Sequence, residues 1–293
     1  MRSVAITGVG ILSSIGNSIE QVESSLENGR SGVSSVPEWA ELGLRSTVAG
    51  RLAGADKLRE ESGIPDDQLM CMSDAALYCA VAGRQAVLDA GLSQTDLESR
   101  RTGCIVGSGI SGTEAVYEGG RQLYSGSPRR VRPFSVLHAM ASSCSANLAT
   151  LLGIGGRSYS ISSACSTSAH GIGHGFELIR AGLLDLAVVG GGEELNPVVA
   201  VAFDAMRMVL STHFNASPQA ASRPFDADRD GFVLAEGAGI LVLEEMNRAK
   251  ARGAHIHGEI IGYAANSGAE DIVLPEADGR AAADCIEAAL QDG

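Results

Sequence analysis

The stretch "YSISSACSTSAHGIG", residues 159–173, joins a short apolar run to a helical pattern through a single cysteine, Cys165. The residues before the thiol predict a buried strand over 159–164, and those after it predict a helix over about 166–180. A thiol at such a junction faces a helix amino terminus, whose N–H groups and partial positive charge stabilise a thiolate and can hold an oxyanion. Cys165 is therefore a candidate nucleophile and oxyanion-hole N–H donor, and the alternative is a buried structural cysteine.

Similar apolar runs bounded by glycine recur on both sides of this stretch, at residues 4–10, 103–109, 186–192 and 239–245. Their hydrophobicity is continuous, which is typical of strands buried on both faces of a parallel sheet. Helical patterns lie between them at residues 73–91 and 132–153, whereas 125–133 resembles a loop. The alternation predicts an α/β fold with helices on both sides of the sheet. A strand over 255–267 and a helix over 279–293 are expected to open a further α/β unit.

Composition excludes several classes of function. The 293 residues carry a net charge of −13, which argues against a nucleic-acid or anionic-membrane surface. The amino terminus has no apolar run long enough for a signal peptide or a membrane span, so the cytoplasm is expected. Six cysteines without a C-x-x-C pair suggest neither a zinc knuckle nor a disulfide framework.

Several weaker patterns lead to no cofactor or metal. "GVGILS" (8–13) lacks the last glycine and the later acidic residue of a dinucleotide site, and "DADRDG" (226–231) has Gly237 where a calcium loop needs a bidentate glutamate. His170 and His174 lie one helical turn apart without a third ligand, so we expect packing histidines. The glycines between and beside them, at 171, 173 and 175, predict a close subunit or helix–helix contact.

Longer motifs resemble one known family. They are "AITGVGILSSIGN" (5–17), "SGVSS" (31–35), "ISSACSTSAHGIGHGFELI" (161–179), "GGGEE" (190–194), "FDAMRMVLST" (203–212), "SRPFDADRDGFVLAEGAGILVLEE" (222–245) and "ARGAHI" (251–256). Together they resemble the β-ketoacyl-[acyl carrier protein] synthases, most closely the type I condensing enzymes of bacterial fatty-acid synthesis. The resemblance covers the whole chain.

The resemblance implies a thiolase fold of two similar α/β halves, each with a mostly parallel five-stranded sheet, in a homodimer. Residues 1–252 would form the first half and 253–293 the start of the second. Cys165 would accept the acyl group, and Phe232 would lie beside the reaction centre. Ile110 and Met140 would line the acyl pocket. For the last three residues, ordinary core packing is the alternative.

The resemblance also implies a decarboxylative condensation in which an acyl-enzyme reacts with malonyl carrier protein in fatty-acid elongation. No cofactor or metal is implied, because the substrates ride on the phosphopantetheine of the carrier. Two family histidine motifs that stabilise the developing charges, and a phenylalanine-glycine loop, do not occur in these 293 residues. We therefore expect a chain truncated within its second half. The alternatives are a condensing enzyme of a dedicated polyene or polyketide lipid pathway and a non-catalytic dimer partner resembling a chain-length factor.

The expected partner, acyl carrier protein, is acidic, and family members present basic residues before the helix that begins here near Ser73. This chain has Asp66, Asp67 and Met70 there. The remaining basic candidate is the "SPRRVR" segment with Arg129, Arg130 and Arg132, for which a solvated loop is the alternative. We expect carrier docking to depend on these three arginines and to favour a less acidic or dedicated carrier.

Overall fold

A mixed β-sheet in the order β5-β4-β6-β7-β1-β8 forms the centre of the molecule. The structure is a computed structural model that describes residues 1–207 and 209–293; Met208, within the motif at 203–212, lies outside them. The sheet consists of β1 (Val4–Leu12), β4 (Thr102–Gly107), β5 (Ser158–Tyr159), β6 (Leu186–Glu193), β7 (Gly237–Glu245) and β8 (Gly258–Ile260). β1, β4, β5 and β6 run in one direction, and β7 and β8 run in the other.

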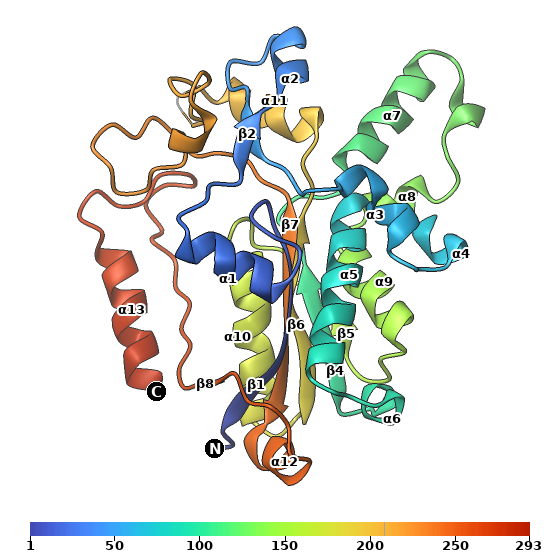
Figure 1. Cartoon of the computed structure of the whole chain (residues 1–293), viewed down its shortest axis with the longest axis vertical. Coiled ribbons are helices and arrows are strands. Elements are labelled where there is room, and N and C mark those ends of the chain that lie inside the picture. The colour runs from blue at the N-terminus through green and yellow to red at the C-terminus, as the bar shows by residue number, and fades with distance from the viewer. Residues whose placement is uncertain (208) are drawn as a thin grey trace.

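Helices cover both faces of this sheet (Figure 1). On one face lie α5 and α9, and on the other lies α10, with α13 farther out. The described helices are α1 (Ile19–Glu27), α2 (Pro37–Glu41), α3 (Ala55–Glu61), α4 (Asp66–Leu69), α5 (Asp74–Asp89), α6 (Gln94–Glu98), α7 (Thr113–Tyr124), α8 (Ser135–Ala139), α9 (Ser143–Leu152), α10 (Thr167–Arg180), α11 (Pro197–Ala205), α12 (Met246–Ala251) and α13 (Arg280–Asp292). Single turns η1 (Pro128–Arg130) and η2 (Pro218–Ala220), and a small sheet of β2 (Val33–Ser35) and β3 (Val48–Gly50), complete the described elements. The expected α/β class is confirmed.

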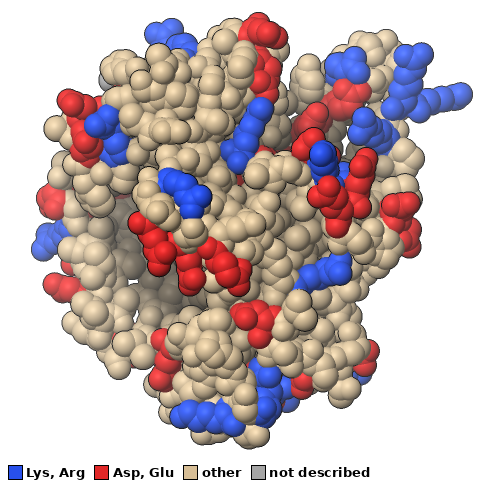
Figure 2. All heavy atoms as spheres, in the orientation of Figure 1, with Lys and Arg blue, Asp and Glu red and all other residues tan. Residues whose placement is uncertain are grey.

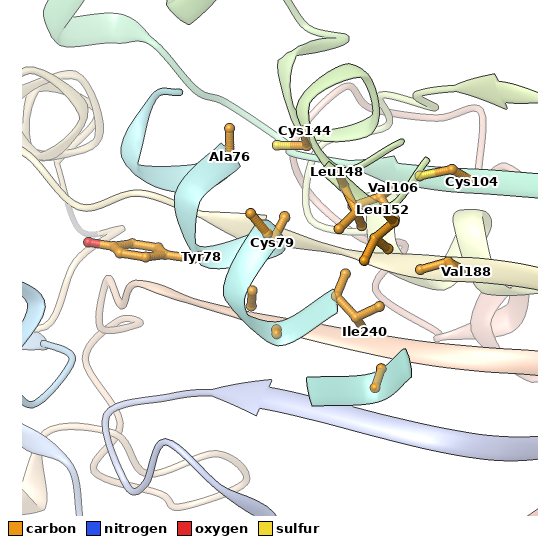
Figure 3. Close-up of a cluster of buried hydrophobic side chains, with 14 of the residues drawn as sticks. Ala76, Tyr78, Cys79, Cys104, Val106, Cys144, Leu148, Leu152, Val188 and Ile240 are labelled. Atoms are coloured by element: carbon orange, nitrogen blue, oxygen red, sulfur yellow. The ribbon is translucent and has the colours of Figure 1, made fainter. Parts of the chain in front are cut away.

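The central strands are buried on both faces, as their continuous apolar runs predict. In β6, Leu186 and Val188 pack with α5 and α9, whereas Ala187 and Val189 pack with α10. Figure 3 shows the first of these clusters, in which side chains of α5 and α9 meet those of β4, β6 and β7. Alternation along each strand therefore supplies two hydrophobic cores, one on each side of the sheet.

Helix α5 lies directly on β1 because glycines of the strand face alanines of the helix. A Cβ on Gly10 would lie 1.8 Å from the carbonyl oxygen of Ala82, and one on Gly8 would lie 2.1 Å from that of Ala86. Ser73 caps the helix by accepting a hydrogen bond from the N–H of Ala76, and the chain leaves it at Gly91, whose φ is +62°. The glycines of the "AITGVG" motif thus set the distance between helix and sheet.

Two expected strands are shorter than predicted. β5 ends at Tyr159, and residues 160–164 follow an irregular path because the Ser160 hydroxyl donates to the Val106 carbonyl, 2.7 Å away, and the turn begins soon afterwards. From the predicted strand over 255–267, only Gly258–Ile260 pairs with β1, as an additional edge strand beyond the expected five. The segment expected to be a loop at 125–133 contains the single turn η1.

The remaining helices agree with the sequence patterns. Residues 132–153 form α8 and α9, with a break between Ala139 and Ser143. The carboxy-terminal helix α13 starts at Arg280. No helix within residues 1–207 and 209–293 is long and apolar enough to cross a bilayer.

Candidate functional site

Cys165 lies at the junction where the chain enters α10, one residue before the cap residue Ser166. Its side chain is exposed. The amino termini of α5, α7 and α10 all lie at the end of the sheet where β4 and β6 finish, which is the upper end in Figure 1. Ligand sites in open α/β sheets form at this carboxyl edge. The structure therefore brings the predicted nucleophile to the edge where the fold favours binding.

The turn that carries Cys165 is held by the first residues of its own helix. The Ser163 N–H donates to the Thr167 hydroxyl at 2.8 Å, and the Ser163 hydroxyl lies 2.6 Å from Nδ1 of His170. Ala164 adopts a left-handed conformation with φ of +50°, which is costly for an L-residue other than glycine. The backbone thus turns sharply immediately before the thiol, in the manner of a nucleophile elbow.

Three strand-end glycines allow this turn to lie close to the sheet. A Cβ on Gly107 would lie 2.3 Å from the Ile161 carbonyl oxygen, and one on Gly191 would lie 2.4 Å from the Ser168 hydroxyl. A Cβ on Gly109 would lie 2.8 Å from the Ala164 carbonyl oxygen. A side chain at Gly107 or Gly109 would push the turn outward, and one at Gly191 would meet the first turn of α10, so the glycines of "GCIVGSG" and "GGGEE" belong to the site.

The carboxylate of Glu193, at the end of β6, binds the segment that follows β4. It accepts hydrogen bonds from the Gly109 N–H at 2.5 Å, the Ser108 hydroxyl at 3.0 Å and the Ile110 N–H at 3.3 Å. We define Ser108–Ile110 as the 108–110 segment. Sequence reasoning did not single out Glu193, although a carboxylate directly after a glycine run at a strand end was an available signal.

The thiols within the core contrast with Cys165. Cys79, Cys104 and Cys144 are fully buried (Figure 3). A hydrogen bond to Cys144 and burial raise the pKa of Cys79, and burial raises the pKa of Cys104 to about 12. These two groups therefore remain neutral thiols at physiological pH, and a neutral thiol is a poor nucleophile. The alternative of a buried structural cysteine does not describe Cys165.

The three predicted apolar site residues are not core residues. Ile110 is 42% exposed, Met140 is 45% exposed and Phe232 is 45% exposed. Phe232 packs edge-to-face against Phe203 of α11, with ring centroids 5.5 Å apart. Ile110 directly follows Gly109, the residue that contacts the turn before Cys165. Apolar side chains left at the surface around this edge are typical of a binding site or an interface.

A cavity of about 680 Å³ lies between α4, α5, α7 and α8, and the carboxyl of Glu194 faces it. Glu194 is only 7% exposed. Burial and the neighbouring Asp74 raise the pKa of Glu194 to about 7, although the Thr113 N–H at 3.3 Å opposes the shift. Asn196 also donates to Glu194, at 3.1 Å. Glu194 therefore titrates near neutral pH, unlike an ordinary surface glutamate.

The three arginines of the predicted docking segment lie in the connection between α7 and α8. Arg129 and Arg130 belong to η1, and they and Arg132 are exposed. Figure 2 shows basic side chains protruding at the upper right, over the connection that follows α7. Arg132 also lines the cavity next to Glu194. Met70, in the acidic segment before α5, joins the same cavity, and its carbonyl lies 2.9 Å from Nε2 of His138.

The histidines and glycines of α10 have structural partners. Nε2 of His174 lies 2.9 Å from the Tyr159 hydroxyl, so it and His170 are packing histidines as expected. Within the described part of the chain, no group of three or more His, Cys, Asp or Glu side chains is placed to hold a metal. A Cβ on Gly171 would lie 3.0 Å from the Ile105 carbonyl oxygen, and one on Gly175 would lie 2.5 Å from a methyl of Val189. At Gly171 and Gly175 the close contact joins the helix to the sheet, and Gly173 faces the ring of Tyr263. The expected helix–helix contact is therefore wrong at these positions, and the alternative of a subunit contact stays a prediction.

Residues 1–249 match the family model described as the beta-ketoacyl synthase N-terminal domain. The chain belongs to the β-ketoacyl synthase family. The 3-oxoacyl-[acyl-carrier-protein] synthase 1 of Haemophilus influenzae is 44% identical over 99% of this chain and 70% of that protein. The family comprises acyltransferase-type condensing enzymes.

Solved β-ketoacyl synthases have the same fold as this chain. A β-ketoacyl synthase from Burkholderia phymatum superimposes with a TM-score of 0.91 at 33% identity, over 100% of this chain and 70% of that one. A type II polyketide ketosynthase, solved in complex with its acyl-carrier protein and bound to a hexaketide, has a TM-score of 0.88 at 31% identity, over 99% of this chain and 70% of that one. The expected thiolase-type ketosynthase fold is therefore confirmed.

Proposed function

We propose that this chain carries the acyl-accepting centre of a β-ketoacyl-[acyl carrier protein] synthase of fatty-acid elongation, with Cys165 as the nucleophile. The observation that carries the proposal is the position of Cys165: an exposed thiol on a strained turn at the amino terminus of α10. The backbone N–H of Cys165, at the start of this helix, is the proposed oxyanion donor.

In the proposed reaction, the Cys165 thiolate attacks the carbonyl carbon of an acyl thioester carried on phosphopantetheine. A bond forms between that carbon and Sγ, the bond to the carrier sulfur breaks, and the released thiolate takes up the proton that Cys165 lost. The carbanion left when malonyl carrier protein loses CO2 then attacks the acyl carbon. The new carbon–carbon bond forms as Sγ leaves as a thiolate. We propose no cofactor or metal beyond the carrier's own phosphopantetheine.

The acyl chain is proposed to extend along Ile110 and Met140, with Phe232 beside the reacting carbonyl. All three side chains are more than two-fifths exposed, which leaves apolar surface for a lipid chain to cover. Ile110 is β-branched and therefore stiff, so its position would restrict how deeply a chain enters. Core packing, the alternative for these residues, leaves this exposure unexplained.

The dedicated-lipid and chain-length-factor alternatives are less well supported. The fatty-acid type relative is 44% identical, whereas the polyketide ketosynthase is 31% identical. Cys165 argues further against a non-catalytic partner, because such a partner needs no reactive thiol. Elongation of fatty acids is thus the preferred assignment.

We propose acyl carrier protein as the partner, docked on Arg129, Arg130 and Arg132, in a cytoplasmic homodimer. The exposed arginines support the first part, because the carrier is acidic. The dimer is supported by β5, which lies at the edge of the sheet, and by exposed apolar side chains on α7 and around the start of α8. These are Val116, Tyr117, Leu123, Tyr124, Phe134 and Val136.

We place the boundary between the two halves at residues 252 and 253, directly after α12. The segment beyond it contacts the first half repeatedly. Its β8 pairs with β1, and Asp292 forms an ion pair with Arg180 of α10 at 2.7 Å. The second half would thus begin against the face of the sheet that α10 covers.

Acylation of Cys165 tests the proposal. The 293-residue chain is incubated with a hexanoyl thioester of N-acetylcysteamine, and the modified residue is located by peptide mass spectrometry. One acyl group is expected on Cys165, none in Cys165→Ala, and an unchanged result in the matched variant Cys71→Ala, which removes a half-buried thiol elsewhere. A folded chain that takes no acyl group, or takes it on another cysteine, would refute the assignment.

A further inference from the structure

Both backbone polar groups of Ile110 are fixed by one polar unit. The Ile110 N–H donates to Oε2 of Glu193 at 3.3 Å, and its carbonyl lies 3.2 Å from the Ser108 hydroxyl, whose single proton is shared between this carbonyl and Glu193. The same hydroxyl lies 3.0 Å from Oε2 of Glu193, and Ser108 is 4% exposed. The position of Ile110 is therefore determined by a buried hydroxyl and a carboxylate rather than by packing of its own side chain, which is 42% exposed.

The other oxygen of Glu193 holds the residue that contacts the nucleophile turn. Oε1 accepts from the Gly109 N–H at 2.5 Å, and a Cβ on Gly109 would lie 2.8 Å from the Ala164 carbonyl oxygen. The 108–110 segment is thus confined between Glu193 on one side and the turn before Cys165 on the other. Hydrogen bonds to a charged acceptor are stronger than neutral ones, so this carboxylate is a firm anchor.

Glu193 is well placed for this task because of where β6 ends. β4 and β6 are parallel neighbours, with Gly107 paired to Gly191, so the chain two residues farther along β6 lies beside the 108–110 segment. Its neighbour Glu194 binds Thr113 and Asn196 instead, toward the cavity. The two consecutive carboxylates thus contact different segments, and only Glu193 reaches Ile110.

We propose that Glu193 is a positioning residue that sets acyl chain-length preference by fixing the backbone of Ile110. The inference rests on the proposed function, since it requires Ile110 to lie on the path of the acyl chain. With the carboxylate intact, Ile110 stays in place and short acyl chains are favoured. When the carboxylate is removed, Ile110 can move aside and longer chains enter.

The decisive experiment compares acylation of Cys165 by hexanoyl and dodecanoyl thioesters of N-acetylcysteamine in the wild type and in Glu193→Gln. Glutamine replaces one carboxylate oxygen by an amide NH2 group, which cannot accept a hydrogen bond. The donors that bind that oxygen would therefore lose their acceptor. We expect the dodecanoyl-to-hexanoyl rate ratio to rise by about threefold or more, within the coupling range of residues in one hydrogen-bond network. Glu236→Gln is the matched control, because that half-buried carboxylate binds the Leu52 N–H and the Tyr78 hydroxyl instead.

The same ratio is then measured in Ile110→Ala. If Glu193 acts through Ile110, adding Glu193→Gln to this variant changes the ratio no further. Ser108→Ala, which removes one donor and keeps the charge of Glu193, should shift the ratio in the same direction by a smaller factor. Ser108→Ala therefore still tests the inference if the Glu193→Gln variant does not fold.

Three results would overturn the inference while leaving the proposed function intact. The first is an unchanged dodecanoyl-to-hexanoyl rate ratio in a folded Glu193→Gln variant. The second is a shift of this ratio by Glu193→Gln that is equally large in the wild type and in Ile110→Ala. The third is a loss of Cys165 reactivity in Glu193→Gln that is equal for both thioesters and for iodoacetamide. The last would mean that Glu193 only supports the turn at Cys165. Failure of the proposed function is distinct, since the wild type would then take neither acyl group on Cys165.

Discussion

Replacing Glu194 by glutamine should change how the stability of the chain depends on pH. Glu194 is 7% exposed, and burial together with the nearby carboxylate of Asp74 raises its pKa from 4.5 to about 7. The difference between those two values corresponds to roughly 3 kcal/mol of unfolding free energy. The folded chain binds this proton more tightly than the unfolded chain, so the wild type is most stable below its unfolded pKa and loses stability as pH rises to about 7. Glutamine stays neutral and removes that loss.

The assay is urea unfolding of the wild type and Glu194→Gln at several values between about pH 4.5 and pH 8. The free energy of unfolding of the variant, minus that of the wild type, should increase across this range by up to roughly 3 kcal/mol and become constant above about pH 8. Titrating groups that do not interact with Glu194 contribute equally to both proteins and cancel. The charged side chains and the histidine that line the cavity with Glu194 are present in both, and they are Arg59, Asp74, Glu114, Glu118, Arg132 and His138.

Glu38→Gln is the matched control, because this exposed carboxyl is not among the residues that line the cavity. Hydrogen bonds from the backbone and from Arg51 lower the pKa of Glu38, so it is charged in the folded and unfolded chains alike above about pH 6. Its difference from the wild type should therefore stay constant between pH 6 and pH 8. A constant difference for Glu194→Gln over the same range would show that Glu194 is charged in the folded chain, and the reasoning from burial would fail.

Three further predictions concern packing and docking. Gly10→Ala should destabilise the chain by about 1–3 kcal/mol in urea unfolding because its Cβ would overlap α5, whereas Gly239→Ala, which faces open space, should not; similar losses in both would contradict the packing account. Leu148→Ala should cost about 2–5 kcal/mol, because this fully buried side chain would leave a cavity, and an unchanged melting temperature would count against it. Arg129→Glu combined with Arg130→Glu should slow association with an acidic carrier protein and weaken its salt dependence, as measured by stopped flow at two ionic strengths. Arg30→Glu, an exposed arginine elsewhere, is the control, and equal rates in all three proteins would exclude the docking segment.

Much of the architecture could be predicted because local patterns and tertiary packing agree. The apolar runs became β1, β4, β6 and β7, and the capped pattern at Ser73 became α5. The predicted strand before Cys165 is wrong beyond Tyr159, because side-chain bonds such as that of Ser160 replace the strand ladder there. Hydrophobic periodicity in the sequence does not show where side-chain hydrogen bonds will replace the hydrogen bonds between strands.

The candidate nucleophile could be singled out from its place at the start of a helix, but the residues that hold its turn could not. Glu193, Gly107 and Gly191 come from two strands that are adjacent only in the folded sheet. The exposure that distinguishes Ile110 from a core residue is likewise visible only in the folded chain. An isoleucine in the sequence is compatible with a place in the core and with a place at the surface.

The left-handed backbone of Ala164 gives the chain a trade-off between stability and activity at one residue. An alanine in this conformation costs about 1–2 kcal/mol that a glycine would not. Glycine would also let the turn sample other conformations, and the thiol that follows would lose its fixed direction. Selection for thermal stability alone would therefore favour glycine at this position, whereas the acyl transfer proposed for Cys165 would favour the strained alanine.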